Sequence, residues 1–265
     1  MCIAVFMWEA HPAYPFLLFL NRDEYHRRPT KALGWWEGGE ILGGRDEEAG
    51  GTWLACTKDG KFAFLTNFRE VQSIPQAKSR GELPVRFLQS KKKPMDFAEE
   101  FVKKADQYNG FNLLIADIHS KSMVYITNRS GGDKTLVTEV SPGIHVLTNA
   151  ALNSPWPKAQ RLVRNFKELM KTYSEGEFPM KEMVDKLMMD TTKVNDESLL
   201  PHIYSPATEY SFSSIFIDTE RPLGRYGTRS TSALHVKSSG EVYFYEKHLE
   251  KDLWKEKTVT YQIEK

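Results

Sequence analysis

The chain begins Met1-Cys2-Ile3-Ala4-Val5-Phe6-Met7-Trp8, a cysteine placed between the initiator methionine and an apolar run typical of a strand. Methionine aminopeptidases remove the first residue when the second side chain is small, which would leave Cys2 with a free α-amine. Such an amine has a pKa of roughly 7.7–8.0, so one residue would supply both a thiol nucleophile and a base near neutral pH. The alternative is that Cys2 is a small buried residue at the start of an edge strand.

The composition is that of an ordinary globular protein. The 265 residues are 40% hydrophobic and 27% charged, which is enough for a full core. A net charge of +1 argues against binding to nucleic acid or to acidic membranes. Cys2 and Cys56 are the two cysteines, which suits a reducing compartment. The most apolar segment, residues 15–20, is too short to span a bilayer. We expect a soluble, cytoplasmic protein without an integral membrane segment.

Apolar runs and turn signals predict alternating blocks of strands and helices. Strands are expected over residues 2–8, 16–21, 52–57, 61–67, 111–118, 123–128, 135–140, 144–148, 213–218, 230–237, 241–248 and 258–263. Helices are expected over residues 81–90, 95–107, 158–173 and 179–189. Short turns between neighbouring strands imply antiparallel pairing. The order predicts one α+β domain over residues 1–265, with two packed antiparallel sheets and helices on their outer faces.

A polar motif, Asn21-Arg22-Asp23-Glu24, follows the second predicted strand. The Arg22 guanidinium is able to bind a carboxylate in bidentate fashion. Asp23 is able to orient an amine or to accept backbone N–H groups. The alternative is a strand that exits into a loop with a surface ion pair, which contributes little.

Two glycine pairs, Gly43-Gly44 and Gly50-Gly51, bracket an acidic loop. They imply a constrained backbone that suits the rim of a pocket, and their spacing is not that of a phosphate-binding loop. Asn67 and Asn149 each end a predicted strand, in Thr66-Asn67 and Thr148-Asn149. Two such amides are able to donate to a developing oxyanion, and the alternative is that each residue forms a turn.

Arg229 lies between hydroxyl residues in Tyr226-Gly227-Thr228-Arg229-Ser230-Thr231, at the start of a late strand. A guanidinium there is able to position a carboxylate or to neutralise an intermediate, and the alternative is a polar stretch of an edge strand. The seven histidines are scattered and none has metal-ligand spacing, so no metal site is expected.

Several motifs occur together in one order, and together they resemble the NRDE-domain family, also called the Transport and Golgi Organization 2 family. The resemblance runs from Met1 to about residue 260. The motifs are Met1-Cys2-Ile3, Asn21-Arg22-Asp23-Glu24, Gly50-Gly51-Thr52-Trp53-Leu54, Thr66-Asn67, Ser79-Arg80-Gly81-Glu82-Leu83, Tyr108-Asn109-Gly110-Phe111-Asn112-Leu113, Thr148-Asn149-Ala150, Pro155-Trp156-Pro157-Lys158 and Tyr226-Gly227-Thr228-Arg229.

The resemblance implies the four-layer αββα sandwich of N-terminal-nucleophile hydrolases. It implies roles in Golgi organisation and secretion, in haem mobilisation, and in mitochondrial lipid and acyl-coenzyme A metabolism. The implied partner is a small-molecule ligand, either haem or an acyl-lipid such as acyl-coenzyme A, with no required cofactor. The implied location is the cytoplasm with mitochondrial or Golgi association. The resulting hypothesis is a protein that binds such a ligand and passes it on.

The chain is more distantly similar to cholylglycine hydrolases and penicillin V acylases, which implies the alternative of a cysteine hydrolase of amides or thioesters. In that reading Cys2 is the nucleophile, Arg22 and Asp23 support the amine and the thiolate, Asn67 and Asn149 frame the oxyanion hole, and Arg229 completes the site. Those hydrolases space the arginine and the aspartate three apart. Adjacent strand residues point to opposite faces, so Arg22 and Asp23 reach one site only where the strand has ended or bulged.

Overall fold

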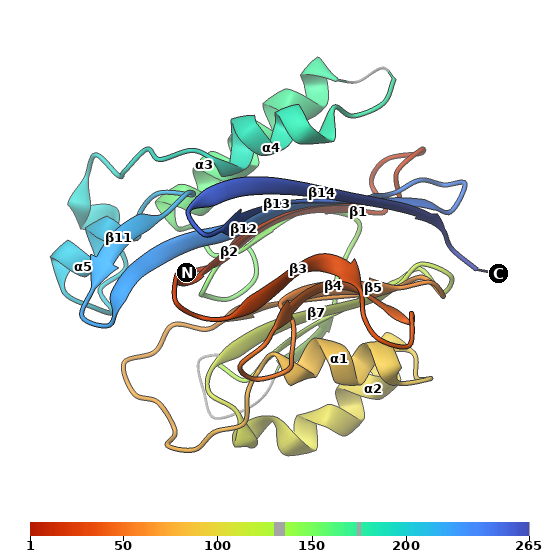
Figure 1. Cartoon of the computed structure of the whole chain (residues 1–265), viewed down its shortest axis with the longest axis horizontal. Helices are drawn as coiled ribbons and strands as arrows, with labels where there is room; N and C mark the ends of the chain where they lie inside the picture. Colours follow the sequence, from red (N-terminus) through yellow and green to blue (C-terminus); the bar gives the residue numbers. More distant parts are fainter. Residues whose placement is uncertain (130–135, 174–175, 265) are drawn as a thin grey trace.

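Two seven-stranded antiparallel sheets pack face to face in the computed structural model, with helices on both outer faces (Figure 1). The structure describes residues 1–129, 136–173 and 176–264. The first sheet has the order β10 (Gly143–Leu147), β1 (Ile3–Trp8), β2 (Phe16–Tyr25), β12 (Gly224–Val236), β13 (Glu241–Glu250) and β14 (Leu253–Gln262), with β11 (Asp218–Arg221) beside β12. The second sheet has the order β3 (Thr30–Trp35), β4 (Ile41–Asp46), β5 (Leu54–Thr57), β6 (Lys61–Asn67), β7 (Phe111–Asp117), β8 (Ser122–Thr127) and β9 (Leu136–Glu139).

The helices form the two outer layers. Helices α3 (Pro157–Thr172) and α4 (Met180–Met188) pack on the first sheet, and α1 (Glu82–Gln89) and α2 (Pro94–Phe101) pack on the second. The 3₁₀ helix η1 (Val102–Gln107) continues from α2, and η2 (Glu197–Leu199) and α5 (Pro206–Ser211) lie between α4 and β11. The predicted α+β fold and its four αββα layers are confirmed. No helix in the described ranges is both long and apolar enough to cross a membrane.

Strand β1 is buried on both faces, which explains its uninterrupted apolar sequence. Ala4, Phe6 and Trp8 belong to the core between the two sheets. Ile3 and Val5 belong to the core under α3 and α4. Strand side chains alternate between faces, so even-numbered residues of β1 face the second sheet and odd-numbered residues face the helices. Because β1 lies between β10 and β2, the expectation that Cys2 opens an edge strand is wrong.

Strand β2 is longer than the sequence predicts. It continues to Tyr25, so the polar motif at residues 21–24 lies within the strand and not after it. Strand β12 pairs along this stretch, which keeps its backbone hydrogen-bonded, and the register shifts between Thr228 and Ser230. The irregularity therefore lies opposite the motif, at Arg229, and not in β2 itself.

Other element predictions are wrong in identifiable ways. Strands β3 and β4 were not predicted, because Gly43 and Gly44 carry a turn signal although they lie inside β4. The predicted strand at residues 213–218 is absent, and the described chain there follows α5 and enters β11 only at Asp218. The second predicted helix, 95–107, changes to a 3₁₀ helix after Phe101. Thr135, the first residue of a predicted strand, lies outside the described residues.

Candidate functional site

The pairing of β1 with β2 determines how the start of the chain meets the polar motif. The register runs Ile3 opposite Asn21, and its continuation sets Cys2 opposite Arg22. Directly opposite residues project to the same face of a sheet. By the alternation along β1, the Cys2 thiol and the Arg22 guanidinium both face the second sheet.

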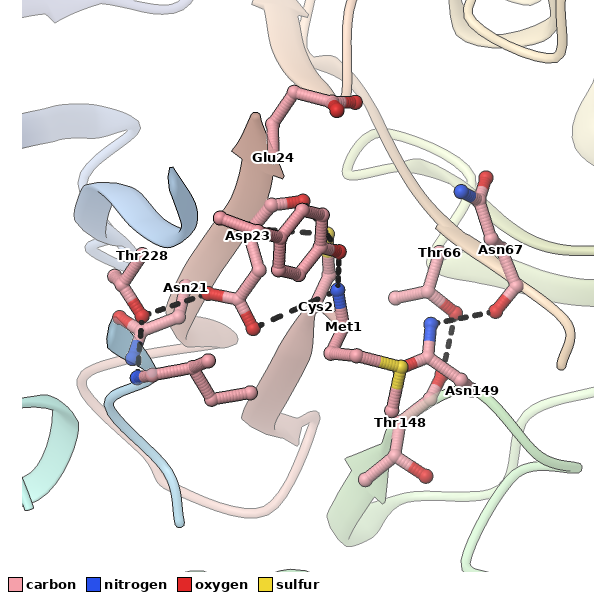
Figure 2. Close-up of polar contacts among 12 residues, drawn as sticks. Met1, Cys2, Asn21, Asp23, Glu24, Thr66, Asn67, Thr148, Asn149 and Thr228 are labelled. Carbon is pink, nitrogen blue, oxygen red and sulfur yellow. Dashed lines mark hydrogen bonds and ion pairs between the residues drawn. The ribbon is translucent and has the colours of Figure 1, made fainter. Parts of the chain in front are cut away.

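Beyond the last paired residues, Ile3 and Asn21, Met1 lies next to Asp23. Met1 packs with Phe212 and Ile217, on the side of the sheet that the helices cover. The Asp23 carboxylate accepts a hydrogen bond of 2.7 Å from the Thr228 hydroxyl through Oδ1. Its Oδ2 lies 3.7 Å from the α-amine of Met1, which donates a hydrogen bond to the Tyr226 hydroxyl (Figure 2). Burial raises the pKa of Asp23, and the α-amine opposes that shift. Arg22 and Asp23 therefore serve opposite faces of one strand, the first beside the thiol and the second beside the amine.

The Cys2 thiol is half-buried beside the backbone of Asp23. Its Sγ accepts from the Asp23 N–H at 3.5 Å and lies 3.9 Å from the carbonyl oxygen of the same residue. Burial raises the pKa of the thiol, while the α-amine and Arg22 act to lower it. The resting thiol is therefore neutral, and a base is needed to activate it.

A cavity of about 320 Å³ lies over Cys2. Most of its lining side chains are charged or polar, and they include Arg22, Asp23, Glu24, Arg28, Asp46, Asn67, Lys78 and Arg80. The Arg22 guanidinium stacks on the Trp53 ring at 4.2 Å and donates to the Thr30 hydroxyl at 3.2 Å. Burial lowers the pKa of Arg22. The stacking contact and the hydrogen bond hold its guanidinium in place.

The glycine pairs lie behind the wall of this cavity, where Gly44 contacts Trp53 and Gly51 contacts Gly81, two residues that line it. A Cβ on Gly44 would lie 2.4 Å from the Trp53 ring, and a Cβ on Gly51 would lie 2.3 Å from the backbone carbonyl of Gly81. The Thr52 N–H donates to that same carbonyl at 2.9 Å. Glycine is therefore required where the loop after β4 meets the segment that begins α1.

A second cavity of about 280 Å³ adjoins the first and shares Asn67, Arg80 and Asn109 with it. The Asn67 side chain is exposed and lines both cavities. Asn149 is buried and lines the second cavity but not the first. Its Nδ2 donates to the Asn67 carbonyl at 2.7 Å (Figure 2). An amide donor is thus available at Asn67, and Asn149 fixes the backbone that carries it.

Arg229 lies beside these cavities without lining either. Its Nη1 donates to the carbonyl of Tyr25 at 3.1 Å and to that of Arg28. These bonds hold the turn between β2 and β3.

Four site residues were given no role by the sequence. Tyr226 and Thr228 hold the α-amine and Asp23, Arg80 lines both cavities, and Lys158 is buried near Asp23. Each lies in one of the motifs that carry the family resemblance, and this is the signal that could have found them. Within the described ranges, no three His, Cys, Asp or Glu side chains gather as metal ligands.

The fold is a four-layer αββα sandwich of two packed antiparallel sheets, with a cysteine at position 2 immediately before the interior strand β1. A mutant conjugated bile acid hydrolase from Clostridium perfringens aligns with a TM-score of 0.49 and 9% identity, over 99% of this chain and 97% of that chain.

The sequence matches are more specific. The family described as Transport and Golgi organisation 2 matches residues 1–251. The Transport and Golgi organization 2 homolog of Mus musculus is 32% identical over 283 residues, covering 99% of both chains. The Transport and Golgi organization protein 2 homolog of Homo sapiens is 33% identical over 280 residues, with the same coverage. The chain belongs to the Transport and Golgi organisation 2 family.

Proposed function

We propose that the protein, once Met1 is removed, is a cysteine N-terminal-nucleophile hydrolase of a small polar amide or thioester. The observation that carries this proposal is that Arg22 and Asp23, which are adjacent on β2, project to opposite faces of that strand. Arg22 lies on the face of the Cys2 thiol. The buried carboxylate of Asp23 lies 3.7 Å from the α-amine of Met1, the residue whose removal would expose the α-amine of Cys2. This chemistry needs a thiol and an amine that serves as its base, and here each of the two has its own charged partner.

The reaction would proceed in two halves. The α-amine of Cys2 takes the thiol proton while Sγ bonds to the substrate carbonyl carbon, and the oxyanion accepts from the Asn67 amide. The C–N or C–S bond then breaks, the ammonium returns its proton to the leaving group, and an acyl-Cys2 remains. Water attacks this thioester and gives its proton to the amine, which passes it back to the departing thiolate. The products are a carboxylic acid and an amine or thiol.

The size and polarity of the cavities support a small, charged substrate. Volumes of about 320 and 280 Å³ lie at or just below the lower end of the range for ligand sites. They meet at Asn67 and Arg80, on either side of the chain start. An acyl group is able to occupy one cavity and its leaving group the other.

Turnover of a panel of short acyl amides and acyl-coenzyme A thioesters tests this function. Cys2→Ala is expected to abolish product release. Cys56→Ala is the matched control, because Cys56 is fully buried, its Sγ accepts from the Tyr261 hydroxyl, and it does not line this cavity. Equal turnover by wild type and Cys2→Ala would exclude the hydrolase.

We propose ligand handling as a second function, on the strength of a groove between α3 and β10. The groove has a volume of about 570 Å³ and an apolar floor that includes Ile144, Val146 and Val163. Arg164, Lys167 and Lys171 line one side, with Glu168 among them. An apolar floor with a mainly basic rim suits an amphiphilic anion, a chemistry that acyl-lipids and haem share.

Titration with haem and with a long-chain acyl-coenzyme A tests this handling function. The triple variant Arg164→Glu, Lys167→Glu, Lys171→Glu is expected to weaken saturable binding at least tenfold, while Cys2→Ala leaves it unchanged. Binding that is unaffected by the triple variant, or no stronger than that of albumin, would reject the groove as the site.

A further inference from the structure

The two cavities beside the chain start hold more positive charge than their own acids neutralise. The Arg28 guanidinium pairs with Asp46 at 2.7 Å, and Asp23 lies beside the α-amine. Arg69 and Glu70 are each paired with a residue that lines neither cavity, at 2.5 and 2.7 Å. Among the described residues, the lining cations left without an ion pair are Arg22, Lys78, Arg80 and Arg221, and the acid left is Glu24. A cleft with an excess of one charge attracts the opposite charge, so the imbalance indicates an anionic ligand.

Arg80 lies where the two cavities meet, and it lines both of them. Its Nη1 donates to the Gly110 carbonyl at 2.9 Å, and its own carbonyl accepts from the Leu83 N–H at 3.0 Å at the start of α1. The next residue, Gly81, is held by the Thr52 N–H, which donates to its carbonyl at 2.9 Å. The guanidinium therefore stands on a fixed backbone, and its other N–H groups have no hydrogen-bond partner in the described ranges.

The acids that act on Arg80 are held by other donors. Glu70 accepts from the Gly110 N–H at 2.6 Å through Oε1 and from the Arg129 Nε at 2.7 Å through Oε2. Glu24 accepts from the backbone N–H of the next residue at 2.8 Å. Burial lowers the pKa of Arg80 while these two acids oppose the shift, and an arginine keeps its charge in a protein. A half-buried guanidinium that lacks a carboxylate partner is well suited to bind one from a ligand.

We propose that the acyl group of the substrate carries a carboxylate, which binds to the Arg80 guanidinium while the scissile carbonyl lies over Cys2. This inference rests on the proposed hydrolase function and names the substrate class of its site. A single guanidinium matches a carboxylate through two parallel N–H···O bonds. The substrate is then the monoamide or monothioester of a short dicarboxylic acid, because a cavity of about 320 Å³ holds only a small group.

The lining of the cavities places this carboxylate on the acyl side of the scissile bond. Cys2 and Arg80 line the first cavity together, so an acyl group bonded to Sγ shares that cavity with the guanidinium. The leaving group takes its proton from the α-amine, and Met1, at the chain start, lines the second cavity. Arg22 stays beside the thiolate, and the exposed Lys78 adds to the attraction of the first cavity for an anion.

Protection of Cys2 from alkylation tests the carboxylate site without any turnover. Iodoacetamide labelling of Cys2 is followed by peptide mass spectrometry at increasing concentrations of glutarate, the acid that a glutaryl amide would release. Wild type is expected to show saturable protection by glutarate. Dimethyl glutarate, which has the same chain without the charges, and inorganic phosphate are expected to give none. Absence of protection by glutarate, or equal protection by either of the other two compounds, would overturn the proposal.

Two arginine variants locate the site. Arg80→Gln is expected to weaken protection by glutarate about tenfold or more, because it removes a charged hydrogen-bond donor. Arg221→Gln is the matched control and is expected to behave as wild type, since Arg221 lines the second cavity but not the first. Equal protection in folded Arg80→Gln and wild type would overturn the proposal. If Arg80→Gln does not fold, the comparison of glutarate with dimethyl glutarate in wild type still decides.

Turnover of a matched pair of substrates separates this inference from the proposed function. Glutaryl p-nitroanilide and its methyl ester differ by one charge. The wild-type kcat/KM is expected to be about tenfold or more higher for the acid, and Arg80→Gln is expected to lose most of that preference. Equal kcat/KM for the two substrates would overturn the inference and leave the hydrolase standing. Turnover of neither substrate, with glutarate still protecting Cys2, would reject the hydrolase and leave the carboxylate site standing.

Discussion

The Asp23 carboxylate lies 3.7 Å from the α-amine of Met1, across the register of β1 and β2. Removal of Met1 would move the α-amine inward by one residue, a Cα step of about 3.8 Å. The amine would then be on the Cα of Cys2, whose Cβ carries the thiol, next to the stretch of β2 from which Arg22 and Asp23 project to opposite faces. In the proposed mechanism, adjacent residues rather than residues three apart serve one nucleophile, because they project to opposite faces of the strand.

Asp23→Asn is expected to lower kcat at least a hundredfold with little change in KM. The buried carboxylate orients the amine that takes the proton, and general-base catalysis contributes roughly 10²–10⁴. The measurement is steady-state turnover at pH 7. Glu24→Gln is the control, because Glu24 lines the same cavity but accepts from its neighbouring backbone N–H of Tyr25. Equal losses in both variants would contradict a specific role for Asp23.

Gly51→Ala is expected to destabilise the fold by about 1–3 kcal/mol, since its Cβ would lie 2.3 Å from the Gly81 backbone. Activity is expected to fall as well, because Gly81 lines the cavity over Cys2. Urea unfolding measures the change in stability. Gly34→Ala is the control, because its nearest non-adjacent atom would be 3.9 Å away. A Gly51→Ala variant as stable as Gly34→Ala would contradict the close approach.

The buried carboxyl of Glu246 is expected to make the free energy of unfolding depend on pH. It lies between the sheets and accepts from the Leu33 N–H at 2.8 Å, and burial raises its pKa to about 7. The folded state binds this proton more tightly than the unfolded state, whose pKa is about 4.3. Stability contributed by this group is therefore present at low pH and lost as pH rises from about 4.3 to about 7.

Urea unfolding of wild type and Glu246→Gln across that range checks the sign. The wild-type free energy of unfolding is expected to fall relative to the variant by up to about 3 kcal/mol as pH rises. Glu139→Gln, which removes an exposed carboxyl on β9, is expected to follow wild type. A difference between wild type and Glu246→Gln that stays constant with pH would reject the shifted pKa.

Much of the fold could be predicted because its signals are local. The apolar run of β1 and the Asp59-Gly60 hairpin turn between β5 and β6 act over a few residues, and both lie where predicted. Strand β14 could only be predicted from residue 258 onward, because its earlier residues are mostly exposed and polar and carry no apolar alternation. Its pairing with β13 depends on backbone hydrogen bonds to a distant segment.

The candidate site was predictable as a set of motifs but not as a geometry. The sequence singles out Cys2, Arg22 and Asp23, yet their division between two faces depends on β2 continuing through the motif. Lys158 carries no sequence signal that separates it from a solvated lysine at a helix start. Its burial depends on the tertiary fold, in which it lines a cavity of about 10 Å³ together with Trp156 and Phe212.

The decisive experiment compares the intact mass of the purified protein before and after brief exposure to an acyl-coenzyme A. A working N-terminal nucleophile is expected to give a starting mass that lacks Met1 and a single acyl adduct that decays with time. The adduct should form in Cys56→Ala and be absent from Cys2→Ala. Retained Met1, or an adduct whose formation does not depend on Cys2, would contradict an N-terminal nucleophile in this chain.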